Sequence, residues 1–447
     1  MKKVLNTIFE KISTIQHLAS MTIVASILLF LAALLAAVMA NSSLAPAYQE
    51  FLSQQVSLQI GDFNLFSHGE HSLTVLQFIN DGLMTLFFFL VGIEIKRELL
   101  VGELSSVRKA ILPFIAACGG MIIPVLIYIL ICPPGTDGGR GLAIPMATDI
   151  AFSLGVLSLL GKRVPLSLKI FLTAFAVVDD IGGIIVIAVF YSSHVAINYL
   201  LWAALLLILL YFIGKRGSTN KTFFLLIGII VWYMFLQSGI HSTIAGVILA
   251  FIVPARPQLH VGKYIESIRC AIKFFPVSDK DDIVLTNKQI AKLKRVESAS
   301  DRVISPLQSM EDNLHIAVNY IVLPLFAFAN AGVAFSGNAE SIGDVTLAVA
   351  FGLIFGKFVG IFSFTWIAVK LKVASMPRTM DWKSVSGISL LGGIGFTVSL
   401  FIANLSFGDT HPVLLNQAKL GILVGTAIAG LLGYLVLHFA LPRHKTH

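Results

Sequence analysis

The chain has 447 residues, of which 56% are hydrophobic and only 13% are charged, and its mean hydropathy is +0.87. Soluble domains carry about 25% charged residues, so this composition excludes a soluble globular protein and predicts an all-α polytopic membrane protein. The formal net charge of +8 does not indicate a nucleic-acid partner, because the basic residues are sorted by membrane side. Cys118, Cys132 and Cys270 are scattered, which predicts neither a disulfide framework nor a structural metal site.

About twelve membrane-spanning helices are predicted in a single transmembrane domain, residues 18–438. Residues 1–17 mix lysines with apolar residues, which predicts an amphipathic segment on the cytoplasmic surface, and residues 439–447 are a cytoplasmic tail. The predicted spans are residues 18–40, 75–97, 110–132, 138–160, 168–191, 197–213, 221–237, 239–254, 313–334, 346–369, 384–406 and 415–438.

The lysines and arginines test this arrangement of spans. Of the 32 basic residues, only Arg140 and Lys419 fall toward the far side, and Lys357 lies within a span. The other 29 (32 minus 3) fall at the two termini and in alternate loops. Loops rich in lysine and arginine stay in the cytoplasm, so this sorting predicts that both termini are cytoplasmic.

A small β-hairpin is predicted on the far side of the membrane, at about residues 55–66. Apolar residues alternate on both sides of Gly61-Asp62, which suits a two-residue hairpin loop. An isolated hairpin is marginally stable in water. It therefore either pairs with a second copy of the chain in a homodimer or packs on its own protomer.

Two adjacent acids, Asp179 and Asp180, fall at the midpoint of the span 168–191. A carboxylate at the bilayer centre costs about 2.5–3.5 kcal/mol on insertion scales, so an acid at this depth indicates function. The alternative is that both acids pair with basic groups and only hold helices together. Two acids in succession favour the functional interpretation.

Two of the predicted spans are interrupted at mid-membrane. The fourth contains Pro145 and Asp149, and the eleventh contains Gly392, Gly393 and Gly395. Proline removes a helix hydrogen bond and clustered glycines weaken a helix, so both spans are predicted to be broken. A simple kink is the alternative for either span taken alone.

The order of the broken spans predicts two inverted three-helix repeats, spans 3–5 and 10–12, with each broken helix in the middle of its group. Two broken helices that cross at mid-membrane bring two partly negative C-terminal ends together, and likewise two partly positive N-terminal ends. Asp149 is placed to neutralise the positive ends. Lys357, at the midpoint of the tenth span, is expected either to neutralise the negative ends or to bond an aspartate of the fifth span.

Eight short segments, distributed in a fixed order over residues 18–438, resemble a known family. They are Phe78-Ile-Asn-Asp-Gly-Leu-Met, Leu90-Val-Gly-Ile-Glu-Ile-Lys-Arg-Glu-Leu, Ala147-Thr-Asp-Ile-Ala-Phe, Val178-Asp-Asp-Ile-Gly, Gly239-Ile-His-Ser-Thr-Ile-Ala-Gly, Leu323-Pro-Leu-Phe-Ala-Phe-Ala-Asn-Ala-Gly, Gly356-Lys-Phe-Val-Gly and Gly392-Gly-Ile-Gly-Phe-Thr-Val-Ser. Together they resemble the NhaA family of bacterial Na⁺/H⁺ antiporters, one of the systems known for inverted repeats.

The resemblance implies a secondary active antiporter of the bacterial inner membrane that expels Na⁺ or Li⁺ in exchange for protons, without a cofactor and without enzyme activity. Asp180 would be the principal ligand of the transported Na⁺ and of the proton, with Asp179 beside it. Thr148 and Asp149 would complete the site between the broken helices, and Lys357 would either pair with Asp179 or exchange protons itself. Two titratable groups against one monovalent ion predict two protons per Na⁺.

The resemblance also implies regulation by pH, through acidic and histidine groups at the cytoplasmic funnel. The matching positions are Glu94 and Arg97 at the end of the second span and Glu311 and His315 at the start of the ninth. Arg97 is expected to bridge the two glutamates. Glu98 is expected to be solvated.

The chain departs from the family in two places. Asp312 stands where well-known members carry a histidine, so a pH profile is not carried over. The cytoplasmic stretch 255–311 is longer than expected and holds ten lysines and arginines. Its apolar residues recur at helical spacing, which predicts an amphipathic helix that lies on anionic lipid, covers the funnel, or is a passive insertion; they are Ile290, Leu293, Val296, Val303, Leu307 and Met310.

Two other functions fit buried acids. An intramembrane aspartyl protease needs two acids that share a proton, as Asp149 and Asp180 could. Against it, Gly393-Ile-Gly395-Phe396 has no aspartate after the second glycine, and Lys357 has no role in that chemistry. A passive cation channel is the other alternative, but two broken helices with an internal charge balance favour a carrier.

Overall fold

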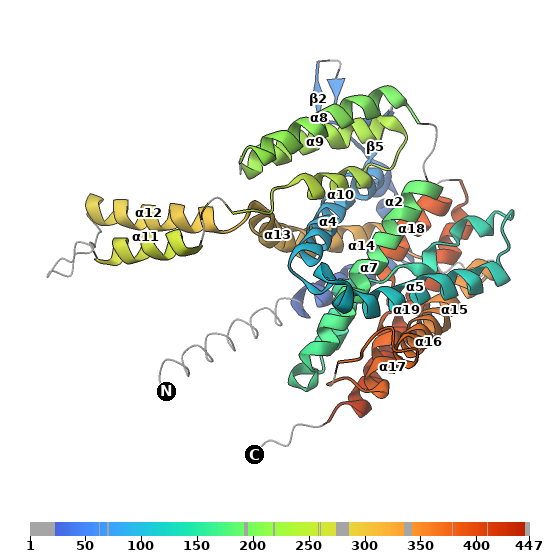
Figure 1. The fold of residues 1–447 in the computed structure, drawn as a ribbon. Coiled ribbons are helices and arrows are strands. Elements are labelled where there is room, and N and C mark those ends of the chain that lie inside the picture. Colours follow the sequence, from blue (N-terminus) through green and yellow to red (C-terminus); the bar gives the residue numbers. More distant parts are fainter. Residues whose placement is uncertain are drawn as a thin grey trace.

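The computed structural model describes residues 23–61, 63–68, 71–191, 195–217, 220–257, 259, 261–273, 286–334, 342–377, 379–408 and 410–442. The described chain is mostly helical (Figure 1). Its α-helices are Ile23–Ala40, α2 (Ala45–Ser53), α3 (Val75–Gln77), α4 (Met84–Leu100), α5 (Val107–Ile131), α6 (Ile150–Ser158), α7 (Leu166–Phe190), α8 (Ile197–Lys215), α9 (Lys221–Ser238), α10 (Thr243–Ile252), α11 (Val261–Lys273), α12 (Asn287–Val303), α13 (Pro306–Ala317), α14 (Leu323–Asn330), α15 (Asp344–Phe351), α16 (Lys357–Lys370), α17 (Trp382–Leu391), α18 (Phe396–Phe407) and α19 (Pro412–Ala440).

Nine to eleven candidate membrane spans are present within the described residues. Nine helices are long and apolar enough to cross a bilayer, and two bent pairs of helices reach the same length together. Three of the nine contain a π-helical turn, over Phe78–Leu83, Val318–Val322 and Gly352–Gly356. The number of apolar spans confirms the all-α polytopic class. The amphipathic segment predicted over residues 1–17 lies outside the described residues.

The eighth predicted span, residues 239–254, is shorter than expected. Gly239 ends α9 with a φ of 78°, a left-handed conformation that stops a helix. The helix that follows, α10, has only 10 residues. At 1.5 Å per residue it is about 15 Å long, half of the roughly 30 Å apolar core of a bilayer. The sequence pattern missed this because the short polar run His241-Ser-Thr is flanked by apolar residues on both sides.

The predicted β-hairpin is present and is part of a larger strand region. Strand β2 (Gln59–Ile60) pairs antiparallel with β3 (Phe63–Asn64). A three-stranded sheet adjoins it, in the order β1 (Gln55–Val56), β5 (His71–Thr74) and β4 (Ser67–His68). Asn64 connects the two sheets, because its amide donates to Ser72 Oγ at 3.0 Å. Of the predicted hairpin, Asp62 alone lies outside the described residues.

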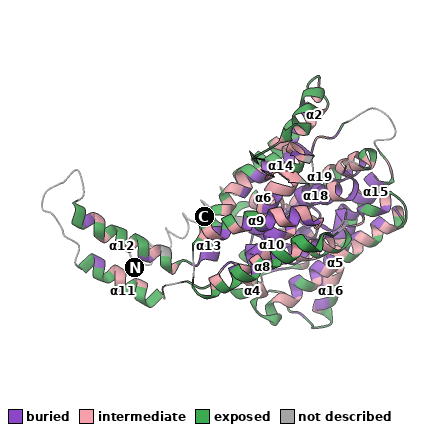
Figure 2. Cartoon of the chain, turned by 90° about the horizontal axis from the view of Figure 1, so that it is seen from above, coloured by how far each residue is buried: buried purple, intermediate pink, exposed green. Residues whose placement is uncertain are grey.

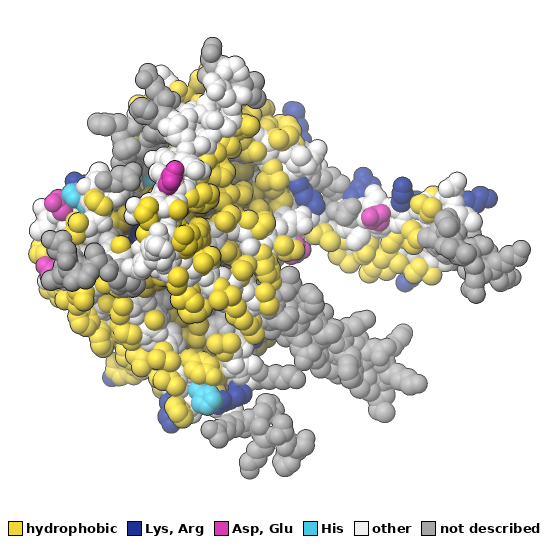
Figure 3. Space-filling view, turned by 180° about the vertical axis from the view of Figure 1, so that it is seen from behind, with side chains coloured by type: hydrophobic (Ala, Val, Ile, Leu, Met, Phe, Trp, Pro, Cys, Tyr) yellow, Lys and Arg dark blue, Asp and Glu magenta, His cyan; other side chains and the backbone are white. Residues whose placement is uncertain are grey.

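The surface of the helix bundle is apolar, as a bilayer requires. Figure 2 shows buried residues gathered inside the bundle, with exposed residues on its outside and on the arm formed by α11 and α12. Leu205 and Leu209 of α8 are 54% and 49% exposed. In Figure 3, hydrophobic side chains cover most of the visible body, while lysines and arginines follow the arm. A soluble monomer rarely exposes so much apolar surface, so lipid covers it here.

The stretch 255–311 forms the arm and the start of a span. Helices α11 and α12 pack against each other and project from the body (Figure 1), and residues 274–285 between them lie outside the described chain. The single helix predicted through Met310 is instead two helices. Ser305 caps α13 in a capping box with Gln308, and Pro306 has no N–H with which to continue α12. Leu307 and Met310 are consequently buried in the core beside α4.

Helices α5 and α16 touch through their backbones. A Cβ atom at Gly119 would lie 2.3 Å from the carbonyl oxygen of Gly360, and one at Gly360 would lie 2.1 Å from that of Gly119. Small residues allow such close packing between membrane helices. The contact fixes the position of Lys357, which lies three residues before Gly360 in α16.

We expect Gly119→Ala to lower the thermal stability of the purified protein, because overpacking at a close contact costs about 1–3 kcal/mol. Gly183→Ala on α7 is the matched control, since a Cβ there meets nothing within 4 Å. Equal melting temperatures for the two variants in detergent would show that α5 and α16 are not in close contact.

Candidate functional site

The paired acids lie in the middle of α7, inside the protein. Asp179 is 2% exposed and Asp180 is 7% exposed. Neighbouring residues of a helix point about 100° apart, so the two carboxylates face different surroundings. Asp179 contacts Lys357 of α16, and Asp180 lines a cavity.

Two broken spans lie beside α7, as the proline and the glycines predict. The segments Gly138–Met146 and Ile150–Ser158 bend by 44°, and α17 and α18 bend by 42°. The two breaks are in direct contact. Four hydrogen bonds to backbone carbonyl oxygens join them: Asp149 N to Ile394 O at 2.6 Å, Thr148 Oγ1 to Gly392 O at 2.8 Å, Ser153 Oγ to Leu391 O at 3.1 Å and Ser399 Oγ to Ile144 O at 2.8 Å.

Asp149 lies at the N-terminal ends of both half-helices. It caps α6, because its Oδ1 accepts a hydrogen bond from Phe152 N at 2.9 Å. Its Oδ2 accepts from Thr397 N at 3.1 Å and from Thr397 Oγ1 at 2.6 Å, at the start of α18. One carboxylate thus binds N–H groups at two partly positive helix ends.

Lys357 lies at the opposite, C-terminal ends of the broken helices and is fully buried. Its ammonium group donates to the Met146 carbonyl, where the first half of the fourth predicted span ends. It also donates to Thr148 Oγ1 at 2.9 Å, and that hydroxyl in turn donates to the Gly392 carbonyl at the end of α17. The third partner is Asp179 Oδ2, at 2.6 Å.

The glycines of the eleventh predicted span are required by close packing. A Cβ at Gly393 would lie 2.3 Å from the Leu353 carbonyl oxygen, and one at Gly395 would lie 2.3 Å from Ser399 Oγ. A Cβ at Gly392 would meet the side chain of Ile361 at 2.5 Å. Side chains at these positions would collide with the tenth predicted span, which contains Leu353 and Ile361, and with α18 itself.

A cavity of about 460 Å³ connects the buried acids with the ends of α4 and α13. Asp180, Asp149 and Thr148 line its inner part, and Arg97 and His315 also line it. The volume holds several water molecules or a hydrated ion. Asp179 is not among the lining residues, because its carboxylate turns toward Lys357.

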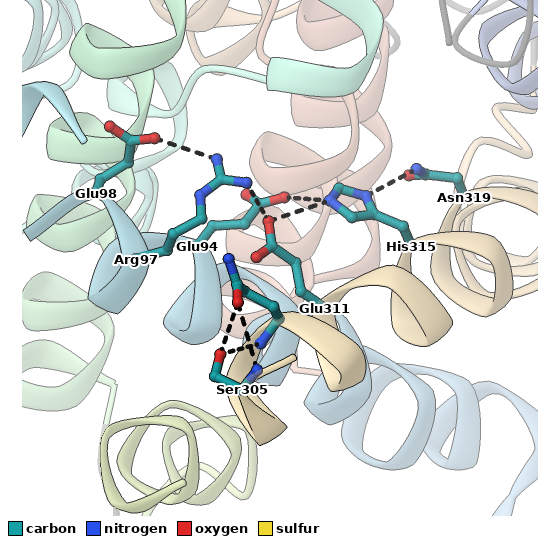
Figure 4. Close-up of polar contacts among 8 residues, drawn as sticks. Glu94, Arg97, Glu98, Ser305, Glu311, His315 and Asn319 are labelled. Atoms are coloured by element: carbon teal, nitrogen blue, oxygen red, sulfur yellow. Dashed lines mark hydrogen bonds and ion pairs between the residues drawn. The ribbon is translucent and has the colours of Figure 1, made fainter. Parts of the chain in front are cut away.

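The predicted pH-regulation residues form one cluster, although α4 and α13 are far apart in sequence (Figure 4). His315 Nε2 lies 3.2 Å from Glu94 Oε1 and 3.8 Å from Glu311 Oε1. Arg97 contacts Glu311 and lies 3.1 Å from Glu98 Oε1. The residue that bridges the two glutamates is therefore the histidine, whereas Arg97 was expected to do so.

The expectation that Glu98 is solvated is wrong. Its side chain is only 13% exposed, and it accepts hydrogen bonds from Arg97 and from the Glu103 backbone N–H at 2.9 Å. The reason is the turn after α4, which folds back over the end of the helix. Such a turn leaves no helical periodicity by which the sequence could reveal it.

Sequence reasoning missed four contributors to the site. Thr397 and Ser399 bind the opposite break, Met146 supplies a carbonyl to Lys357, and the Phe175 ring centroid lies 5.7 Å from the Lys357 ammonium. A hydroxyl residue two positions after the last glycine of the break was a usable signal for Thr397. The other three contacts depend on which helices are neighbours, and local sequence does not record that.

An apolar helix bundle in which two interlocked broken helices enclose buried carboxylates and a lysine belongs to the class of membrane ion transporters. A family model described as "Na+/H+ antiporter 1" matches residues 16–437. A relative from Bacteroides fragilis, "Na(+)/H(+) antiporter NhaA", is 72% identical over 97% of this chain and 99% of its own length. A relative of the same name from Bacteroides thetaiotaomicron is 71% identical over 97% of this chain and 98% of its own length. A relative from Saccharophagus degradans, named "Na(+)/H(+) antiporter NhaA 1", is 43% identical over 96% of this chain and 92% of its own length.

The chain belongs to the NhaA family of Na⁺/H⁺ antiporters, as the eight sequence segments predicted. Members of this family are transporters, so the protein is not an enzyme. The alternative of an intramembrane aspartyl protease is therefore wrong, and so is that of a passive channel.

Proposed function

We propose that this protein expels Na⁺ from the cell in exchange for protons, and that Asp180 is the principal ligand of both ions, with Asp179 beside it. The observation that carries the proposal is that Asp180, almost fully buried in mid-helix, faces the cavity. Na⁺ is a hard cation that prefers oxygen ligands, and Li⁺ shares this preference. A carboxylate holds either a proton or such a cation, so the two ions compete for one site.

The broken helices supply further oxygen atoms beside the carboxylate. Thr148 Oγ1 accepts a hydrogen bond from Lys357 and donates one to Gly392 O. A hydroxyl oxygen has two lone pairs, so Thr148 keeps one for a cation. Asp149 and Lys357 act as compensating charges for the paired half-helix ends. The site needs no cofactor, because the ions themselves are the substrates.

The architecture we propose around this site has twelve helices in two inverted three-helix repeats, spans 3–5 and 10–12. Each broken span is the middle of its group, and the two breaks contact each other as members of such a pair would. The site would then lie at the bilayer midplane, where it can open to either side in turn. Competition between ions at such a site produces exchange without ATP.

We expect two protons to enter for each Na⁺ that leaves. Asp179 and Asp180 are two titratable groups, whereas the site binds one monovalent ion, so the cycle moves net charge. The test is the reversal potential of the purified protein in proteoliposomes, with opposed Na⁺ and proton gradients. A potential that corresponds to one-for-one exchange would contradict the stoichiometry but not the exchange itself.

Regulation by pH is proposed for the cluster of Glu94, Arg97, Glu311 and His315. These side chains share ion pairs across α4 and α13, and Glu94, Arg97 and His315 line the cavity that leads to Asp180. Protonation of histidine near neutral pH changes the charge of the cluster. A change in this charge would change how the two helices pack at the cavity.

We place the protein in the bacterial inner membrane, with both termini in the cytoplasm, because lysines and arginines gather on the side of the termini. The β2–β3 hairpin then lies in the periplasm. Its strands have open edges, which suits pairing with a second copy in a homodimer.

A further inference from the structure

Three side chains beside the cavity, two of which line it, bring metal-ligating atoms close together. The atoms of Glu94, Glu311 and His315 all lie within 4.8 Å of one another. Figure 4 shows the three side chains converging from α4 and α13, and the shortest distance, from His315 Nε2 to Glu94 Oε1, is 3.2 Å. Ligands of a tetrahedral zinc ion, at 2.0–2.1 Å from the metal, lie about 3.3–3.4 Å from one another. The three atoms are therefore at most about 1.5 Å farther apart than the ligands of such an ion.

The helices hold the ligands in a chelating arrangement. Glu311 and His315 are four residues apart on α13, so both project from the same face. Pairs of ligands at this spacing on one helix are common in zinc sites. Glu94 completes the set from α4, and the cavity provides water for a fourth ligand.

Surrounding groups orient the histidine and set the charge. His315 Nδ1 lies 3.4 Å from the side-chain amide of Asn319, one turn further along the helix. The amide atom that faces the ring is Asn319 Nδ2. A 180° flip of the amide would turn its oxygen toward the ring, so that Nδ1–H donates to it and the Nε2 lone pair is left for a metal. Arg97 contacts Glu311 Oε1, which is also the oxygen that lies 3.8 Å from His315 Nε2. A carboxylate has two oxygens, so rotation of this carboxylate would let Glu311 keep Arg97 on one oxygen and present the other to a metal. Glu98 and Asp312 add negative charge nearby.

We propose that Glu94, Glu311 and His315 form a binding site for a divalent transition-metal ion of the zinc type, separate from the Na⁺ site at Asp180. The mixed set of one imidazole and two carboxylates favours Zn²⁺ over Mg²⁺ and Ca²⁺, which prefer oxygen ligands alone. The bound ion would lie in the same cavity as Asp180 and would repel Na⁺ on its way there. Zinc is therefore an inhibitor of exchange at this site.

The test is a Zn²⁺ titration of the full-length protein, purified in detergent without a polyhistidine tag, by isothermal calorimetry. His315→Gln, Glu94→Gln and Glu311→Gln are compared with Asp312→Asn, which removes a nearby charge but no ligand. Loss of a mere orienting partner of a ligand weakens metal binding by about 10–100-fold. We therefore expect each ligand variant to lose at least about tenfold in affinity at one site, while Asp312→Asn stays within a few fold of the unmodified protein.

A second readout separates ligation from simple charge attraction. Co²⁺ bound in place of Zn²⁺ should give a visible absorption band of a four- or five-coordinate ion, and His315→Gln should remove it. Equal Zn²⁺ titrations for all variants, or a Mg²⁺ affinity equal to that for Zn²⁺, would overturn the proposal. These measurements do not require transport, so the metal site and the exchange activity are tested independently.

Discussion

Replacing Asp180 by asparagine is expected to abolish the Na⁺-dependent collapse of a pH gradient in everted membrane vesicles. Asparagine is nearly the same size as aspartate, but it neither releases a proton nor offers a negative charge to a cation. Asp180 lines the cavity and is almost fully buried, so bulk water cannot replace its carboxylate as the ligand of the cation and the proton. Dye fluorescence should therefore stay at the level of vesicles that lack the protein, at every Na⁺ concentration.

The matched control is Asp137→Asn, the same chemical change at a side chain that is 71% exposed in the loop before the fourth predicted span. It should exchange Na⁺ for protons as the unmodified protein does. Both variants are compared at equal amounts of protein in the membrane. Sustained exchange by Asp180→Asn would contradict the proposal that Asp180 is the principal ligand, whatever the control does.

Lys357→Met is expected to destabilise the protein strongly. Methionine keeps the length of the side chain but leaves the buried carboxylate of Asp179 without its ammonium partner. Removal of one partner from a buried ion pair costs about 3–5 kcal/mol, mainly because the other charge stays uncompensated. The Met146 carbonyl loses its donor as well. The melting temperature of the purified protein should fall clearly below that of the unmodified protein.

The double variant Lys357→Met with Asp179→Asn identifies the cause. Removing both charges removes the uncompensated one, so most of the lost stability should return. If the double variant melts no higher than Lys357→Met, the ion pair is not what Lys357 contributes. The contacts to Met146 and Thr148 would then carry its structural role.

Sequence analysis predicted those parts of the site whose signal lies within one short stretch of the chain. Long apolar runs predicted the spans, Pro145 and the glycines predicted the two breaks, and two acids in a lipid-length segment marked Asp179 and Asp180. Each of these signals is a composition or a spacing within about 20 residues. Such signals can be recognised without knowing which helices are neighbours in the folded protein.

The parts that were missed depend on tertiary contacts or on small backbone changes. Glu94 and His315 are more than 200 residues apart, and only the packing of α4 against α13 shows that the histidine bridges the glutamates. The shortness of α10 and the end of α12 follow from single residues, Gly239 and Pro306, inside apolar or amphipathic patterns. The spacing of apolar residues does not reveal such an interruption when the residues on both sides of it fit the same helical pattern.

The four hydrogen bonds to backbone carbonyl oxygens between the breaks have a mechanical consequence. Each buried bond that is lost without replacement costs about 1–3 kcal/mol, so prising the two bends apart would cost on the order of 4–12 kcal/mol. Conformations that exchange during a working cycle differ by only a few kcal/mol. The two broken spans must therefore move together as one rigid block. The conformational change that carries an ion across the membrane has to occur where this block contacts the surrounding helices.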